Sequence, residues 1–279
     1  MSTEVREVAL TAFYCCALRA QDAANPSPVC GDTFAVQFLD DDVRARIAPL
    51  LAFRGPGASN IARHRLIDDL LRDALRADSS RRILVLGAGF DTRAFRLSGG
   101  RWWEFDDPAL FALKEARLPE RSAPNPLSRQ SIDFRRERLA DRLAPFAGDD
   151  PAMVVLEGVS MYLPPDVLRT FAGTVREALP RARFIADLMT AKFRRRFGAS
   201  LARELKRLGA NFADADAHPQ AAIGGAGYRL IASSSIVERA RQAGIFPVPR
   251  FLLNTLLREA RDGYQVYLFE AAPNEGVAT

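Results

Sequence analysis

Apolar residues recur at helical spacing through the first part of the chain, which predicts helices over residues 4–20, 33–52 and 59–77. Ser59 is the expected N-cap of the third helix. A polar break with two prolines and a glycine, NPSPVCGD, follows the first helix. We therefore expect residues 1–80 to be helical and to precede any strand.

Short apolar runs then alternate with helical segments, which is typical of βαβ units and a mostly parallel sheet. The runs expected to form buried strands are residues 82–86, 101–105, 128–133, 152–156 and 183–188. Helices are expected between them over residues 108–118 and 164–179, and the second begins with a pair of prolines.

This alternation stops beyond Thr190, where the chain becomes less regular. Residues 192–208 predict one basic helix, and residues 211–227 are rich in alanine and glycine with little periodicity. The last elements expected are strands over 228–232 and 264–271 and helices over 236–242 and 250–261.

Together these elements predict a single α/β domain built on a doubly wound, mostly parallel, seven-stranded sheet. A helical lid would precede the sheet, and an insertion would follow the fifth strand. The expected parts are a lid over residues 1–80, a cofactor-binding core over 81–190, a lid insertion over 191–227 and C-terminal strands over 228–279.

Composition narrows the class of protein. Hydrophobic residues make up 48% and charged residues 26% of the 279 residues, as in ordinary globular proteins. The chain has no run of about 18 apolar residues, and charges interrupt the first apolar stretch, so we expect no membrane span and a cytoplasmic location. The cysteines, Cys15, Cys16 and Cys30, have no zinc-site spacing with the two histidines. We expect buried thiols and no metal.

The net charge of +5 comes from arginine, since only three of the 39 basic residues are lysines. Most arginines alternate with acidic residues. The one cluster, residues 194–196, has no ladder of aromatic residues beside it, so we do not expect nucleic-acid binding. These arginines are either a solvated helix face or a site that recruits an anionic small molecule.

The sharpest local signal is ILVLGAGFDTRAFRL, a buried strand that enters a glycine turn. Gly87 and Gly89 leave the turn without side chains, so a ligand can approach the backbone, and the N-terminus of a following helix would favour anions. A dinucleotide-binding turn needs a third glycine where this chain has Thr92. A nicotinamide-dependent oxidoreductase is therefore disfavoured, although it remains an alternative.

Acidic residues follow the expected second, third and fourth strands. Asp106 lies 19 residues beyond Gly87, the spacing of a ribose ligand in doubly wound folds. Asp133 and Glu157 end the next two strands. Each acid alone is compatible with a solvated cap, but the series beside a glycine turn indicates a ligand site at the carboxyl ends of the strands.

Five segments in this order resemble the leucine carboxyl methyltransferase family of S-adenosylmethionine-dependent methyltransferases, including its bacterial small-molecule members. They are ARHRLID at 62–68, LGAGFDTR at 86–93, WEFD at 103–106, Asp133-Phe134, and EGVSMYL at 157–163. The resemblance implies a class I methyltransferase fold and S-adenosyl-L-methionine as cofactor.

The resemblance also implies a role for each matching residue around the methionine part of the cofactor. Arg63 would bind its carboxylate through two contacts, and Arg19 would lie near the same carboxylate. Gly87, Ala88 and Gly89 would give the methionine moiety room against the backbone.

The other matching positions would surround the nucleoside and the amino group. Asp106 would accept from the ribose hydroxyls. Asp133 would accept from the adenine amino group, with Phe134 supplying an adjacent amide or apolar face. Glu157 would lie near the methionine amino group.

Three positions depart from the family pattern: His64 replaces a threonine, Thr33 a proline, and Phe134 a leucine. His64 either lies on the surface of its helix or faces the pocket. His64 and Tyr162 are the candidates for a general base, and both are weak. Because an ionised acceptor needs no base, we expect O-methylation of a carboxylate or acidic hydroxyl.

The expected acceptor is a small molecule, and whether it is anionic stays open. Whether it is a metabolite or a protein C-terminus stays open, and the sequence carries no signal for the oligomeric state. A non-catalytic binding protein that retains the fold is a further alternative.

Overall fold

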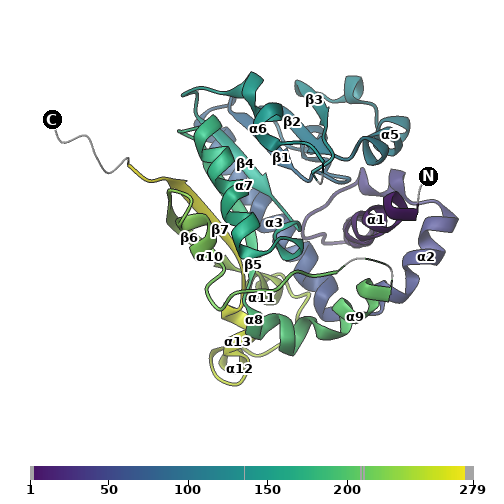
Figure 1. The fold of residues 1–279 in the computed structure, drawn as a ribbon. Helices are drawn as coiled ribbons and strands as arrows, with labels where there is room; N and C mark the ends of the chain where they lie inside the picture. The colour runs from purple at the N-terminus through teal and green to yellow at the C-terminus, as the bar shows by residue number, and fades with distance from the viewer. Residues whose placement is uncertain (1–2, 135, 208, 210, 274–279) are drawn as a thin grey trace.

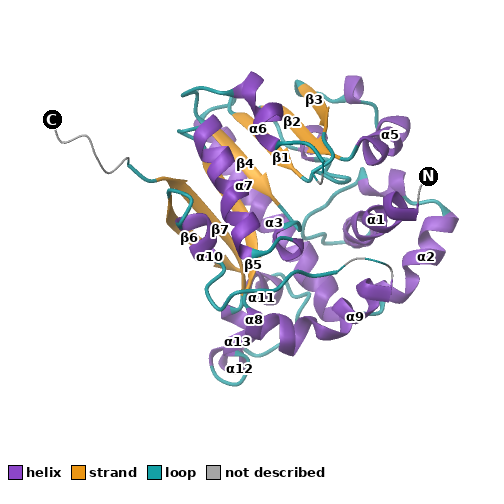
Figure 2. Cartoon of the chain, in the orientation of Figure 1, coloured by secondary structure: helices purple, strands orange, loops and turns teal. Residues whose placement is uncertain are grey.

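A seven-stranded sheet forms the centre of the molecule, with helices on both faces (Figure 1, Figure 2). The computed structural model describes residues 3–134, 136–207, 209 and 211–273. The strands, in the order β3-β2-β1-β4-β5-β7-β6, are β1 (Arg82–Leu86), β2 (Arg101–Asp106), β3 (Leu127–Ser131), β4 (Ala152–Leu156), β5 (Arg183–Met189), β6 (Tyr228–Ser235) and β7 (Tyr264–Ala271). Strands β1 to β5 are parallel, and β7 runs antiparallel between β5 and β6. The predicted α/β fold with a doubly wound, mostly parallel sheet is confirmed.

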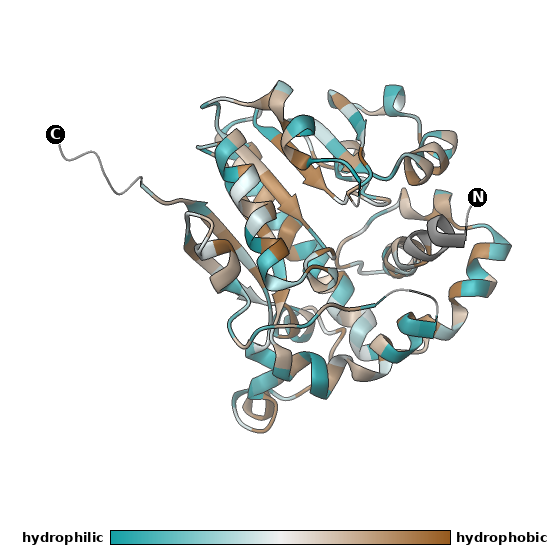
Figure 3. Ribbon diagram, viewed as in Figure 1, coloured by the Kyte–Doolittle hydropathy of each residue, from teal (hydrophilic) through white to brown (hydrophobic). Residues whose placement is uncertain are grey.

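Alternate residues of the central strands face opposite layers of helices, because successive side chains of a strand point to opposite faces. Ile83 and Val85 belong to the core that includes α3 (Arg54–Ala77). Leu84 and Leu86 belong to the core that includes α7 (Pro165–Ala178). The hydropathy colouring of Figure 3 shows these central strands as strongly hydrophobic. The first core also contains residues of α5 (Pro108–Arg117), α11 (Ile236–Gln242) and α13 (Arg258–Asp262), and the second contains residues of α6 (Leu139–Leu143) and α10 (Gln220–Gly224).

A third, smaller core joins the N-terminal helices to the segment that follows β5. It combines Tyr14 and Leu18 of α1 (Thr3–Ala23), Leu50 of α2 (Asp41–Leu51) and Leu205 of α9 (Ala199–Arg207). Figure 1 shows α1, α2 and α9 gathered beside the sheet. The two segments expected to act as lids are therefore one packed unit.

The prediction of a single helix over residues 33–52 is wrong. The chain forms a short 3-10 helix, η1 (Ala35–Phe38), and then α2. Asp40 separates them, because its backbone is extended and its side chain accepts from the Val43 backbone N–H at 2.9 Å. An N-cap of this kind starts a new helix.

Ser59 is not the N-cap of α3, which begins at Arg54. The first turn of the helix contains Gly55, Pro56 and Gly57. Proline is tolerated in a first turn because its missing N–H has no partner there in any case. The helix is therefore 24 residues long.

The helix expected over 192–208 is present as a continuous helical run with a π-helical turn in it, whereas the helix expected over 250–261 is divided. The first consists of α8 (Ala191–Phe193), a π-helical turn η5 (Arg194–Gly198), and α9, while its expected last residue lies outside the described residues. The second consists of α12 (Arg250–Asn254) and α13, separated where Thr255 leaves helical geometry at φ −121° and ψ −94°. Helix α10 was not expected in the alanine- and glycine-rich segment.

Short turns complete the architecture: α4 (Arg93–Arg96), η2 (Glu120–Ser122), η3 (Ala144–Phe146) and η4 (Ser160–Tyr162). Strand β3 ends at Ser131, so Asp133 lies in the loop beyond it. Within the described residues, no helix is both long and apolar enough to cross a lipid bilayer. Cys16 and Cys30 are buried free thiols, as expected, whereas Cys15 is half-buried.

Candidate active site

A cavity of about 1110 Å³ lies where the parallel strands end. Its wall combines the loops that follow β1 to β4 with residues of α1, the beginning of α3, and the chain beyond β5. Ligands of open α/β sheets bind at this end of the strands. The predicted residues in the wall are Arg19, Arg63, His64, Gly87, Ala88, Gly89, Asp106, Asp133, Phe134, Glu157 and Tyr162.

The glycine turn after β1 is shaped for close approach. Gly87 and Gly89 have φ values of +70° and +52°, which side chains rarely permit. A Cβ at Gly87 would lie 2.5 Å from Cγ2 of Val159. Helix α4 is a single turn that begins only at Arg93, so the expected helix N-terminus does not face the glycines. A ligand at this turn would therefore meet backbone atoms without side chains, and not the N-terminus of a helix.

Asp106 ends β2 directly beside this turn. The β1–β2 register pairs Leu86 with Phe105, which brings Asp106 level with Gly87. Asp106 Oδ2 accepts from the Gly89 backbone N–H at 2.6 Å, and Oδ1 accepts from the Asp107 backbone N–H at 2.7 Å. Its residue is only 8% exposed, and burial raises the pKa of its carboxyl. The two backbone bonds fix the carboxylate and leave lone pairs for further donors.

Arg63 and Glu157 contact each other in the wall of the cavity. Arg63 Nε donates to Glu157 Oε1 at 3.0 Å, and Nη1 donates to the hydroxyl of Tyr264 at 2.9 Å. The second guanidinium nitrogen, Nη2, makes a longer contact, 4.0 Å, with the sulfur of Cys15. Among the described residues, Nη2 is thus the least engaged nitrogen of Arg63 and the one most available to a ligand.

Asp187 supports this side of the cavity and was not predicted. Its Oδ1 accepts from the Gly158 backbone N–H and its Oδ2 from the Tyr264 hydroxyl, both at 2.7 Å. Arg63 Nη1 lies 3.4 Å from the same Oδ2. Asp187 therefore orients both Arg63 and the turn after β4. The available signal was an acid in the middle of an apolar strand, since a buried charge needs partners.

His64 borders the cavity, which is the second of the two alternatives that the sequence left open, and it is held in a buried network. It is 1% exposed, so it is not a surface residue, and both ring nitrogens are engaged. Arg96 Nη2 lies 2.7 Å from Nε2, and Glu157 Oε2 lies 3.2 Å from Nδ1. Burial, followed by the charge of Arg93, lowers the pKa of His64. Arg93 Nη2 also lies 2.8 Å from Nδ1, so both ring nitrogens are occupied by neighbouring side chains and neither is left for a substrate proton.

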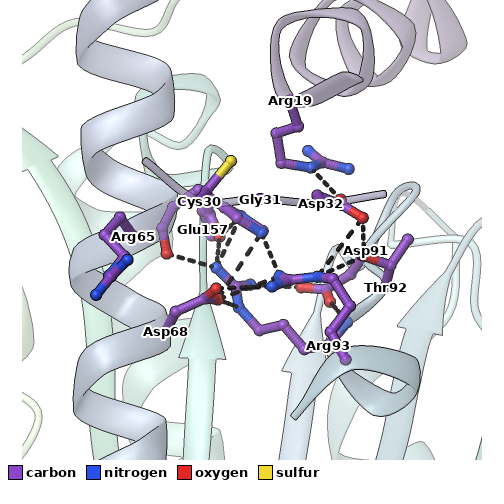
Figure 4. A network of polar contacts seen from close by, with 12 residues as sticks. Arg19, Cys30, Gly31, Asp32, Arg65, Asp68, Asp91, Thr92, Arg93 and Glu157 are labelled. Atoms are coloured by element: carbon purple, nitrogen blue, oxygen red, sulfur yellow. Dashed lines mark hydrogen bonds and ion pairs between the residues drawn. The ribbon is translucent and has the colours of Figure 1, made fainter. Parts of the chain in front are cut away.

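Arg93 is the centre of the buried network drawn in Figure 4. Its guanidinium donates to Asp68 Oδ1 at 2.6 Å, Asp91 Oδ2 at 2.5 Å and Glu157 Oε2 at 2.7 Å. The positive neighbours hold the pKa of Glu157 well below its usual range, against the effect of burial. Glu157 is therefore a fixed anion. Arg93 and Asp68 lie within the matched motifs, but the sequence assigned them no role.

Arg19 ties α1 to the glycine turn. Its Nε donates to Asp32 Oδ2 at 2.8 Å, and its Nη2 donates to the carbonyl oxygen of Phe90 at 2.7 Å. The Thr92 hydroxyl donates to Asp32 Oδ1 at 2.7 Å, as Figure 4 also shows. Although burial opposes ionisation, the charge of Arg19 helps to lower the pKa of Asp32 to about 2. The predicted proximity of Arg19 to the cofactor carboxylate stays a prediction.

The remaining predicted residues, Asp133, Phe134 and Tyr162, also line the cavity. The Phe134 residue is 40% exposed, and its ring centroid lies 6.1 Å from that of Phe171. Asp133 Oδ2 is 3.6 Å from Arg136 Nε. Burial raises the pKa of Tyr162, so its phenol keeps its proton at neutral pH and is unsuited to act as a base.

The arginine cluster at residues 194–196 does not line the cavity. Arg194 Nη2 lies 3.6 Å from Asp214, and the Arg196 guanidinium lies over the ring of Phe197. Arg195 and Arg196 are exposed. The interpretation as a solvated helix face fits these positions better than recruitment of an anion.

Comparison with known proteins identifies the family of the chain. The sequence model of the family described as "Leucine carboxyl methyltransferase" matches residues 12–176, and the chain belongs to this family. A protein of Mycobacterium marinum named "Putative S-adenosyl-L-methionine-dependent methyltransferase" is 32% identical over 57% of this chain and 50% of its own length. One of the same name from Mycobacteroides abscessus is 28% identical over 72% of each chain. In the first of these, the chain spans about half the length of the relative it matches.

Solved structures with the same fold extend this similarity to most of the chain. A DUF574 family protein from Streptomyces avermitilis has a TM-score of 0.58 and 14% identity, covering 94% of this chain and 97% of its own. A Thermobifida fusca protein described as a "putative methyltransferase" has a TM-score of 0.58 and 17% identity, covering 84% of this chain and 90% of its own. At these identities the likeness concerns the fold alone.

Proposed function

We propose that this chain is an S-adenosyl-L-methionine-dependent O-methyltransferase that acts on a carboxylate or acidic hydroxyl of a small molecule. The observation that carries the proposal is the pairing of a side-chain-free turn with a fixed, buried acid. Gly87 and Gly89 open the turn, and the Gly89 backbone holds Asp106 beside it. The chain's family and the names of its relatives support the same cofactor.

The residues present fit this cofactor. Gly87 and Gly89 line the cavity without side chains, and Asp106 has lone pairs for two ribose hydroxyls. Arg63 Nη2 would meet the methionine carboxylate, and Glu157 would attract the amino group from beside it. Asp133 and Phe134 would contact the adenine. When bound, the cofactor supplies a methyl group activated by a sulfonium.

Neither of the two residues considered as a general base, His64 and Tyr162, is available for that role. His64 is neutral with both nitrogens engaged, Tyr162 keeps its proton, and Glu157 is an anion paired with arginines. An acceptor oxygen that is already ionised needs no proton acceptor. The transfer then forms one O–CH3 bond and breaks one S–CH3 bond, and no proton has to leave. This supports a carboxylate or acidic hydroxyl as the acceptor.

The lids would contribute by holding the acceptor and excluding water, which favours an in-line displacement. Phe193, Leu201, Leu205 and Phe212 of the segment 191–227 line the cavity opposite the strand ends. Leu205 also packs on α1 and α2, so the segment closes the cavity together with the N-terminal helices.

Calorimetric titration of the purified protein with S-adenosylmethionine, S-adenosylhomocysteine and NADH tests the cofactor assignment. We expect one equivalent of each adenosyl compound to bind and NADH not to bind. Binding of NADH alone would instead support an oxidoreductase.

Catalysis requires a second measurement, because a binding protein would pass the first. The protein is incubated with cofactor labelled in its methyl group and the small-molecule fraction of a bacterial extract. We expect label in that fraction, and alkali releases it as methanol if the product is an ester but not if it is an ether. Absence of label transfer would favour a non-catalytic binding protein.

A further inference from the structure

The charges of the cavity wall are confined to one end. They come from the strand-end loops and from two arginines on the lid helices, and they are Arg19, Arg63, Asp91, Asp106, Asp107, Asp133, Arg136, Glu137 and Glu157. The wall contributed by residues 189–260 contains no charged residue in the part of the chain that the structure describes. We call this wall the acceptor compartment.

Aromatic and aliphatic side chains fill the acceptor compartment. Phe193 and Phe197 have ring centroids 5.4 Å apart, and the ring of Phe212 lies 5.4 Å from that of Tyr162. Leu201 lies beside Phe212 in the small core with Tyr14. Such surfaces bind rings and aliphatic chains by burying apolar area and gain nothing from a charged group.

Hydrogen-bonding capacity in the surrounding wall is small and uncharged. Four buried side-chain atoms of the described residues lack a partner, and two of these belong to wall residues, the hydroxyl of Tyr14 and Oδ1 of Asn60. Tyr14 is 3% exposed and Asn60 is 8% exposed. Because both atoms are themselves buried, they add little hydrogen-bonding capacity to the surface that a ligand would meet.

The volume of the cavity allows a second molecule beside the cofactor. Pockets for one drug-sized ligand usually measure about 300–1,000 Å³, and this cavity has about 1110 Å³. A peptide is a poor occupant, because each of its residues brings a backbone N–H and C=O that would need partners. The acceptor compartment offers mainly hydrocarbon.

We propose that the acceptor is an apolar, ring-bearing small molecule, uncharged except at the oxygen that is methylated, and not a protein C-terminus. The proposal rests on the proposed function and names the class of its substrate. It also replaces the expectation of recruitment by the arginine cluster, because those arginines lie outside the wall.

The test uses the neutral fluorescent probe N-phenyl-1-naphthylamine with the full chain saturated by S-adenosylhomocysteine. We expect the probe to bind with enhanced fluorescence. We expect 1-naphthoate to displace it, and acetyl-Ala-Ala-Leu with a free carboxyl group not to displace it at equal concentration. Failure of the probe to bind, or displacement by the peptide as readily as by 1-naphthoate, overturns the proposal.

Two matched variants locate the probe. Leu201→Asp places a carboxylate in the compartment and should weaken probe binding by at least about ten-fold, because an unpaired charge is costly to bury. Ser200→Asp adds the same charge at the exposed neighbouring position and should leave probe affinity unchanged. Equal probe affinity in the Leu201→Asp variant and the original protein would overturn the proposal.

A folding defect is separated from the expected effect by S-adenosylhomocysteine calorimetry on each variant. If Leu201→Asp does not fold, Leu201→Trp fills the same space without a charge and should also weaken probe binding. If the unmodified protein does not bind S-adenosylhomocysteine, the proposed function fails. If it binds that compound but not the probe, only the acceptor class is wrong.

Discussion

Replacing Asp106 by alanine should selectively remove the ribose contact. The carboxylate is fixed by the backbone N–H groups of Gly89 and Asp107, so little ordering remains to be done when a ribose binds. Hydrogen bonds to a charged group contribute about 1.5–3 kcal/mol. The affinity for S-adenosylhomocysteine should therefore fall by roughly 10- to 150-fold.

The assay is isothermal titration calorimetry, with Asp149→Ala as the control, since Asp149 is an exposed acid outside the cavity wall. Adenosine and 2′,3′-dideoxyadenosine separate loss of the hydroxyl contact from a disturbed loop. The unmodified protein should prefer adenosine, and Asp106→Ala should bind the two equally. Unchanged affinity for S-adenosylhomocysteine, or a preserved preference for adenosine, would refute the ribose assignment.

The same carboxyl predicts a pH dependence of binding. Burial raises the pKa of Asp106 above that of an ordinary aspartate. Affinity for S-adenosylhomocysteine should therefore decline as the pH falls through this raised pKa, because protonation removes the charged acceptor. In Asp106→Ala this part of the pH dependence should be absent. An identical pH profile in the two proteins would contradict the reasoning.

Three further predictions concern the arginines, the lid and acid stability. Arg63→Lys should weaken S-adenosylhomocysteine binding by at least about ten-fold, because the single ammonium of lysine cannot replace a guanidinium that also contacts Glu157. The calorimetric control is Arg76→Lys, at an exposed position of the same helix, and near-normal affinity in Arg63→Lys would show that Arg63 is only structural. Replacing residues 195–211 by a glycine-serine linker spares α10 and its buried residues, so it should preserve S-adenosylhomocysteine affinity and abolish binding of N-phenyl-1-naphthylamine. Retained probe binding would exclude the lid role of this segment. Asp32→Asn should lose at least about 2 kcal/mol of unfolding free energy in urea at pH 7, because the folded-state pKa of Asp32 is lowered from 3.8 to about 2. The stabilisation by this carboxylate is present above pH 3.8 and fades as the pH falls toward 2, so an equal loss at both ends of this range would contradict the linkage.

The part of the site that follows from strand order was predictable. Parallel strands bring their carboxyl ends to one edge, so the residues after β1, β2 and β4 had to meet there. Gly87, Asp106 and Glu157 all line the cavity at that edge. The spacing from a glycine turn to an acid is a local property of one βαβ unit, which is why a single sequence suffices to find it.

The buried network was not predictable in the same way. Whether His64 faces water, the cavity or Arg93 depends on the rotation and exact start of α3, and the helix begins five residues before the expected cap. Asp187 lies in β5, and its partner Tyr264 is 77 residues away in the antiparallel strand β7. No local pattern encodes such a pairing. The packing of α9 on α1 likewise depends on apolar contacts between segments that are distant in the sequence.

The most direct test of the account is a crystal structure with S-adenosylhomocysteine bound. We expect both ribose hydroxyls within hydrogen-bond distance of Asp106, the homocysteine carboxylate near Nη2 of Arg63, and the sulfur facing the side of the cavity lined by Leu201 and Phe212. A ligand bound with its ribose away from Asp106, or outside this cavity, would contradict the account.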